Sequence, residues 1–107
     1  MLIEKQTQYS AGDVVTFKLY NGDEVVAKVL SETTDSWHID RPTTVVPSQK
    51  GIMLVATLFT GEPDSRPVLR KDHVLLHTTT VKEVRDHYIE QTTGIRPVSA
   101  GGIIAGI

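Results

Sequence analysis

The chain has 107 residues, no cysteine and a net charge of −2. This length fits one domain with a modest core, and the lack of cysteine excludes disulfides, thiolate metal ligands and cysteine nucleophiles. The slightly acidic balance argues against strong nonspecific DNA binding, and no apolar run is long enough to cross a bilayer, so we expect a cytoplasmic domain with no membrane attachment.

Two half-buried strands are predicted near the start of the chain. Residues 14–20 and 24–30 each alternate apolar and polar side chains, as a strand with one buried face does. An Asn-Gly pair between them indicates a tight turn. A one-residue slip would turn every side chain over, so the alternation favours a three-residue loop with Gly22 in a left-handed conformation. This register pairs Phe17 with Ala27.

The middle of the chain predicts further strands. A third strand, 36–41, is expected to end at Pro42, and two prolines make 42–50 a loop, with extended backbone around 45–46 as an alternative. Residues 51–59 are apolar on both faces. One face should join the core, while the other meets either a helix or a neighbouring subunit. The last of five strands is expected at 73–78, and the loop before it has 68–70 as a candidate for a short additional strand.

A single helix is predicted after the last strand. Residues 80–83 have the Thr-x-x-Glu form of a capping box, and apolar residues follow at helical spacing. Gly94 stands where a helix should stop. The helix should therefore cover about 81–93 and complete a single domain, 1–94. The segment 95–107 ends in apolar, glycine-rich PVSAGGIIAGI and should be mobile or docked on another surface.

Together these elements predict a mainly β fold. Five short, closely connected strands suggest a small, strongly bent five-stranded antiparallel barrel with a C-terminal α-helix. Such a barrel can leave two open strand edges, which need charge, cover or pairing. Pairing between identical copies in a closed ring would satisfy both edges. Cover by the predicted helix is the competing interpretation.

Several motifs carry a family resemblance. Residues 15–29, with their apolar spacing around Asn-Gly, resemble the first motif of the Sm-like family. Residues 35–38 resemble the Asp-x-x-Asn that follows it, with His38 in the Asn position. Arg70 and Lys71 resemble the Arg-Gly step of the second motif, with Lys71 in the glycine position. Four stretches are similar to Sm-like proteins of T4-type phages, including cyanophages: 22–28, 45–48, 71–74 and 88–92.

This resemblance implies an assembly and a ligand. Sm-like proteins are bent barrels that pair the fourth strand of one subunit with the fifth of the next, and their rings bind single-stranded, often uridine-rich RNA. The chain should then be a noncatalytic, ring-forming RNA-binding protein without a cofactor, in the host cytoplasm if a phage encodes it. The expected subunit interface contains Met53 and Val55 of one strand, with Val74 and Leu76 of the other.

Four residues are candidates for the RNA site. By resemblance, Trp37 and His38 contact bases, while Arg70 and Lys71 contact phosphates. Trp37 has an alternative role in the core beside Ile39, which is favoured because tryptophan is highly buried on average. The two cations have an alternative role as solvated loop residues that offset nearby carboxylates.

Catalysis and metal binding find little support in the sequence. No nucleophile elbow, phosphate-binding glycine loop or His-Glu-x-x-His motif is present, so no enzyme is expected. His73 and His77 would lie about 13 Å apart on a strand, too far to share an ion, and should be exposed. The alternative function is a structural or adaptor protein, which assembles through the barrel and holds a protein partner with its helix or tail.

Overall fold

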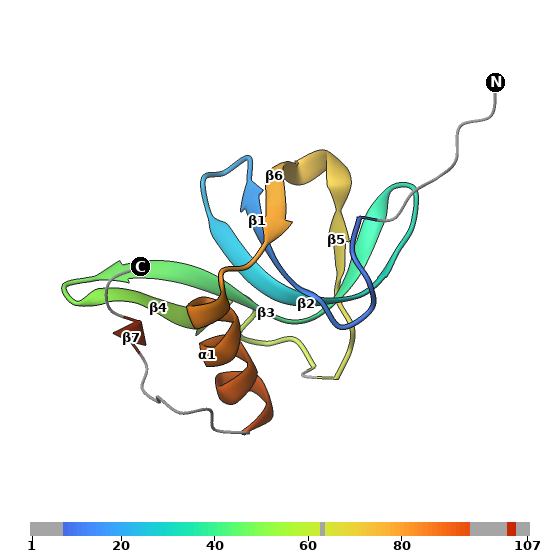
Figure 1. Cartoon of the computed structure of the whole chain (residues 1–107). Coiled ribbons are helices and arrows are strands. Elements are labelled where there is room, and N and C mark those ends of the chain that lie inside the picture. Colours follow the sequence, from blue (N-terminus) through green and yellow to red (C-terminus); the bar gives the residue numbers. More distant parts are fainter. Residues whose placement is uncertain (1–7, 63, 95–102, 105–107) are drawn as a thin grey trace.

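The protein is an antiparallel β-sheet with one α-helix packed against it (Figure 1). The computed structural model describes residues 8–62, 64–94 and 103–104. The mainly β fold with a C-terminal helix is confirmed. The elements, in chain order, are β1 (Val14–Leu19), β2 (Glu24–Glu32), β3 (Ser36–Ser48), β4 (Gly51–Ala56), β5 (Val68–Arg70), the 3₁₀ turn η1 (Lys71–His73), β6 (Val74–Thr79), α1 (Lys82–Thr93) and β7 (Ile103–Ile104).

Six strands follow one another in the order β6-β1-β2-β3-β4-β7, and β5 pairs with β3 off this path. The two end strands do not pair with each other, so the sheet is not closed. One edge of β3 pairs with β2, and the other pairs first with β5 and then with β4. Because η1 leads directly from β5 into β6, which pairs with β1, the sheet curls strongly around its inner face (Figure 1).

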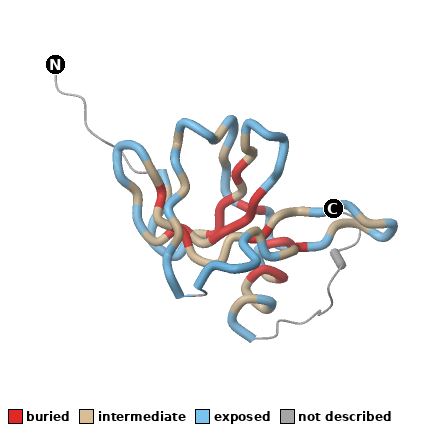
Figure 2. The backbone as a smooth tube through the Cα atoms, turned by 180° about the vertical axis from the view of Figure 1, so that it is seen from behind, coloured by how far each residue is buried: buried red, intermediate tan, exposed pale blue. Residues whose placement is uncertain are grey.

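The sheet is buried on both faces near its centre (Figure 2). Successive residues of a strand point to opposite faces, so Val15 joins the inner cluster and Val14 the outer one. The inner cluster consists of Val15, Phe17, Ala27, Val29, Trp37 and Ile39. The outer cluster consists of Val14, Val26, Leu54, Val84 and Tyr88. Helix α1 therefore covers the face of β4 that carries Leu54, while no residue of β4 belongs to the inner cluster.

Strand β3 continues through Pro42, so the predicted loop at 42–50 is wrong. The pairing with β2 shifts between Val26↔Thr43 and Lys28↔Asp40, which inserts one extra residue into β3. Arg41 lies in this bulge with a φ of 47°. The bulge interrupts the ladder next to Pro42, which has no N–H to donate, and the strand can therefore pass through a proline.

Tyr88 of α1 fills the gap that the bulge leaves. Its hydroxyl donates to the carbonyl oxygen of Asp40 at 2.6 Å, with the Arg41 carbonyl at 3.1 Å. The same oxygen accepts a hydrogen bond from the Lys28 backbone N–H at 3.1 Å. Burial raises the pKa of Tyr88 to about 12, so the hydroxyl stays protonated at neutral pH. The helix is thereby fixed to the sheet at the point where the ladder is broken.

The first hairpin has the expected faces but a different register. Phe17 lies opposite Val25 rather than Ala27, and the Leu19 N–H donates to the Asp23 carbonyl at 2.8 Å. A shift of two residues keeps every side chain on its predicted face. Gly22 has a φ of 98°, as the loop requires.

Other element boundaries also differ from expectation. Strand β4 ends at Ala56 rather than at residue 59, and the turn η1 precedes β6. No side chain caps the helix N-terminus, so the capping box is wrong. The Thr80 hydroxyl instead bonds the Thr16 hydroxyl at 2.8 Å, across the β1–β6 end of the sheet. The helix ends at Gly94, which has a φ of 81° and serves as the left-handed C-cap.

Candidate functional site

The four predicted RNA-site residues meet where β3 pairs with β5. Trp37 lies opposite Leu69, and Ser36 lies opposite Arg70. The Lys71 backbone N–H donates to the Asp35 carbonyl at 2.8 Å, which joins η1 to the turn between β2 and β3. Two segments that are distant in sequence therefore form one end of the sheet.

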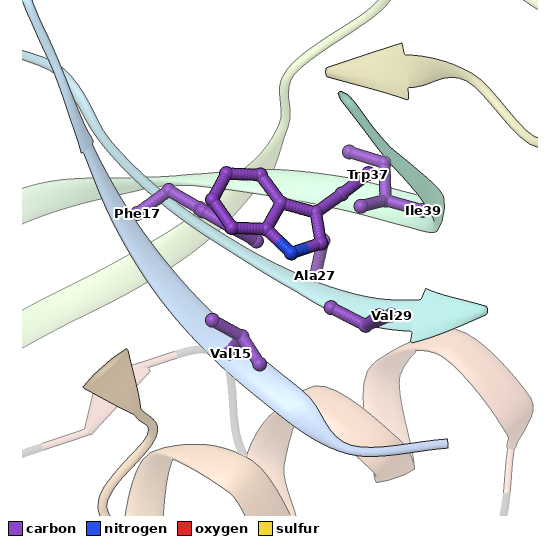
Figure 3. Close-up of a cluster of buried hydrophobic side chains, with 6 residues drawn as sticks. All are labelled: Val15, Phe17, Ala27, Val29, Trp37 and Ile39. Atoms are coloured by element: carbon purple, nitrogen blue, oxygen red, sulfur yellow. The ribbon is translucent and has the colours of Figure 1, made fainter. Parts of the chain in front are cut away.

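Trp37 lies in the inner core. Its side chain is 2% exposed and packs among the inner cluster (Figure 3). The ring centroid lies 5.0 Å from that of Phe17 and 4.9 Å from that of His77. No face of the indole is open to stack on a base, so the core role is the one that the structure shows. The base-contacting role expected from the resemblance does not fit this packing.

Lys71 forms an ion pair rather than a free cationic site. Its Nζ lies 2.6 Å from Glu32 Oε2, and the Glu32 side chain is only 7% exposed. The ammonium also lies 5.0 Å from the centroid of the Trp37 ring, in the range of a cation–π contact. Burial opposes ionisation of Glu32, but the hydrogen bond and charge of Lys71 hold the pKa of this carboxyl below its ordinary value.

Arg70 and His38 lie on the rim of this site. The Arg70 guanidinium donates to both Asp72 carboxylate oxygens, at 3.2 and 3.0 Å, and its side chain is 65% exposed. The hydrogen bond and charge of Asp72 raise the pKa of Arg70. His38 is half-buried and follows Trp37, so its side chain points to the opposite face of β3. Of the four residues, Arg70 is the most available to a phosphate, because an exposed pair exchanges readily with solvent.

Sequence reasoning missed Tyr9 at this end and assigned His77 to the surface. The Tyr9 hydroxyl and His77 Nδ1 lie 2.6 Å apart, and their rings meet edge to face. His77 is half-buried against Trp37, so its predicted exposure is wrong, while His73 is exposed as expected. Burial, and then the charge of Glu32, raise the pKa of Tyr9. His77 lies opposite Phe17 and the register of β6 shifts at Leu75, and this shift breaks the alternation that spacing along the sequence would predict.

The contacts at this end hold the side chains in fixed positions rather than bring reactive groups together. The rings of Tyr9, His77, Trp37 and Phe17 form a continuous chain of contacts, closed on one side by the Lys71–Glu32 pair. Within residues 8–62 and 64–94, no three His, Asp or Glu side chains converge as metal ligands would. What this end offers a ligand is a rim of exposed hydrogen-bond donors around a packed interior.

The four predicted interface residues lie at the two ends of the sheet. Met53 and Val55 belong to β4, and Val74 and Leu76 belong to β6. Val74 packs against the inner cluster, which leaves it little surface for a partner. A bulge at Leu75 lets both neighbouring leucines point outward, with Leu75 53% and Leu76 66% exposed. Leu76 also lines a hollow of about 300 Å³ with Thr16, Lys18, Glu24, His77 and Thr78.

A larger hollow, of about 390 Å³, lies near the helix C-terminus and the loop after β4. Its walls include the exposed side chains of Leu58 and Phe59. Arg41 spans it, donating to the Thr92 carbonyl at 3.1 Å and to Asp64 at 3.3 Å. None of the predicted site residues lines this hollow.

Comparison with known proteins identifies no relative from which a function could be inferred. The chain matches no family model, no curated protein and no solved structure. In the part of the chain that the structure describes, no helix is long and apolar enough to cross a membrane.

Proposed function

We propose that the protein is a noncatalytic, Sm-like assembly protein, in which β6 of one copy pairs with β4 of the next. The observation that carries this proposal is the outer edge of β6, which has no strand partner among the described residues. This edge also exposes Leu75 and Leu76 side by side. An open, apolar strand edge is a template for pairing with another chain, and natural proteins rarely leave one uncovered.

The topology supports a ring. Strand β6 stands at one end of the strand order, and β4 lies next to the short β7 at the other end, so pairing of β6 with β4 joins unlike edges of neighbouring copies. Such head-to-tail contacts close into a ring when the rotation between copies is suitable. The continuation of the β3 edge from β5 to β4, and the short link from β5 to β6, agree with the bent barrel that the Sm-like resemblance implies.

Leu76→Lys is expected to weaken self-association by at least about tenfold. Burying a leucine contributes about 1.5–3 kcal/mol, and a lysine on an edge strand opposes pairing. Tenfold in the dissociation constant corresponds to about 1.4 kcal/mol. The measurement is sedimentation velocity over a concentration series. Tyr20→Lys, an exposed change in the β1–β2 turn, should leave association unchanged. A monomeric wild-type protein, or equal association of Leu76→Lys and wild type, would contradict the proposal.

A second candidate function is the binding of single-stranded RNA at the β3–β5 end. The observation that favours it is the meeting of the two motif segments there, with exposed Arg70 on the rim and half-buried His38 on the adjoining strand. In this proposal Arg70 exchanges Asp72 for a phosphate, and His38 hydrogen-bonds a base edge. Trp37 and the Lys71–Glu32 pair hold in place the two strands that carry Arg70 and His38.

Arg70→Ala is expected to lower RNA affinity severalfold and to reduce the slope of log K against log salt by about 1. The measurement is titration of labelled U-rich RNA, A-rich RNA and matched DNA at two salt concentrations. Lys50→Ala, an exposed cation in the β3–β4 turn, is the matched control. Equal losses for both variants would indicate nonspecific attraction, and an undetectable affinity of wild type would remove this function.

A further inference from the structure

The outer edge of β4 is already partly occupied within the chain. The Gln91 amide of α1 donates to the Leu54 carbonyl at 2.9 Å. Strand β7 pairs with the same strand, with Ile104 opposite Ile52 and Ile103 opposite Met53. Alternate residues of a strand direct their backbone groups to the same edge, so Ile52 and Leu54 both present theirs on this side. A side chain and a two-residue strand thus cap neighbouring positions of one edge.

This cap is short compared with the edge that it covers. Strand β7 has two residues, whereas β4 has six. Strand β6, also six residues long, matches β4 in length and has its own outer edge unpaired in the described part of the chain. Six paired residues provide more ladder hydrogen bonds than two, so β6 of a second copy is a strong competitor for this edge.

A second copy would also cover the exposed apolar side chains beside the β4 edge better than β7 and Gln91 do. Met53 remains exposed although β7 pairs beside it. The leucines at 75 and 76 are exposed on β6, so an intermolecular pairing would cover apolar side chains from both partners. Antiparallel neighbours bring such side chains together across the ladder.

We propose that β7 and Gln91 cap the β4 edge in the single chain, and that β6 of a second copy displaces them during assembly. This inference rests on the proposed function and adds a regulatory step to it. In the free chain the β4 edge is covered while the β6 edge stays open, and association requires an exchange of a short internal strand for a longer external one.

Ile104→Pro in the full-length chain tests the cap. Proline has no N–H and cannot support the Ile52–Ile104 pairing, so the edge should open and self-association should tighten. The expected change is about 2- to 10-fold in the dissociation constant, which corresponds to the net contribution of one hydrogen bond. Ile104→Val keeps the N–H and the branched side chain and should behave as wild type. Gln91→Ala should change association in the same direction as Ile104→Pro.

The outcomes separate the cap from the assembly itself. Tighter association of Ile104→Pro that is lost again when Leu76→Lys is added supports displacement by β6. Weaker association would mean that β7 belongs to the contact between copies, and unchanged association would mean that β7 does not guard the edge. Either result overturns the cap while the Leu76→Lys test of assembly stands. If neither wild type nor Ile104→Pro associates, the proposed function and the cap both fail.

Discussion

Replacing Trp37 by alanine is expected to lower the free energy of unfolding by about 3–5 kcal/mol. The ring is almost fully buried and touches Phe17 on one side and His77 on the other. Its removal leaves a cavity in a close-packed core and removes the aromatic surface over which the Lys71 ammonium lies. Urea unfolding monitored by circular dichroism measures the loss, which comes close to the whole stability of many small domains.

His38→Ala is the matched control for this substitution. His38 neighbours Trp37 in β3 but points to the other face, so its loss should change stability by no more than about 0.5 kcal/mol. Trp37→Phe should recover part of the stability lost in the alanine variant. A stable Trp37→Ala protein that fails only in RNA binding would show that the indole acts at the surface, against the packing described above.

Tyr88→Phe is expected to destabilise the protein by about 1–3 kcal/mol, because it leaves buried backbone groups without a partner. The hydroxyl serves the Lys28 N–H and the Asp40 carbonyl at the break in the ladder. Phenylalanine keeps the packing of the ring, so the loss reports the hydrogen bonds. Besides unfolding, amide hydrogen exchange at Lys28 should become faster in the variant. Equal stability and unchanged exchange would contradict the role given to Tyr88.

The alkaline behaviour of the same residue provides a second measurement. The pKa of Tyr88 is raised from 10.0 to about 12 in the folded protein, so the folded state favours the neutral phenol. Its contribution is therefore fully present below pH 10 and is lost as pH rises toward 12. The stability difference between wild type and Tyr88→Phe should shrink over that range. Tyr20→Phe, at an exposed tyrosine, should have the pH dependence of wild type.

Alternation of apolar and polar residues predicted on which face of the sheet each side chain lies, but it did not predict the register between the strands. It identified the inner residues of β1 and β2, because burial on one face leaves a period of two. It could not distinguish the pairing of Phe17 with Val25 from that with Ala27, since the two registers differ by two residues and keep the same faces. The hydrogen bond from Leu19 to Asp23 decides between them.

Predictions from local sequence patterns were wrong where a residue distant in sequence makes the deciding hydrogen bond. Pro42 was expected to end a strand, but the bulge at Arg41 and the Tyr88 hydroxyl compensate for the broken ladder. Thr80 was expected to cap the helix, but its hydroxyl meets Thr16, which is 64 residues away in sequence. Both compensations arise from tertiary contacts, which spacing along the chain does not encode.

The two motif segments lie together as the resemblance implies, but the surroundings of their side chains differ from expectation. Motif resemblance identified both segments that meet at the β3–β5 end. The state of each side chain depended on partners from elsewhere: Glu32 neutralises Lys71, and His77 and Phe17 enclose Trp37. Glu32 and Lys71 are 39 residues apart in sequence, so no local sequence pattern predicts their ion pair.

The late position of β6 in the chain has a consequence for biosynthesis. Strand β1 is synthesised before its second neighbour, β6, which follows only after β2, β3, β4 and β5. Until then β1 has a vacant edge, and the inner face lacks His77 and Val74. Nascent chains therefore pass through a stage in which β1 is open to wrong partners, and rapid synthesis of the segment from β2 to β6 shortens that stage.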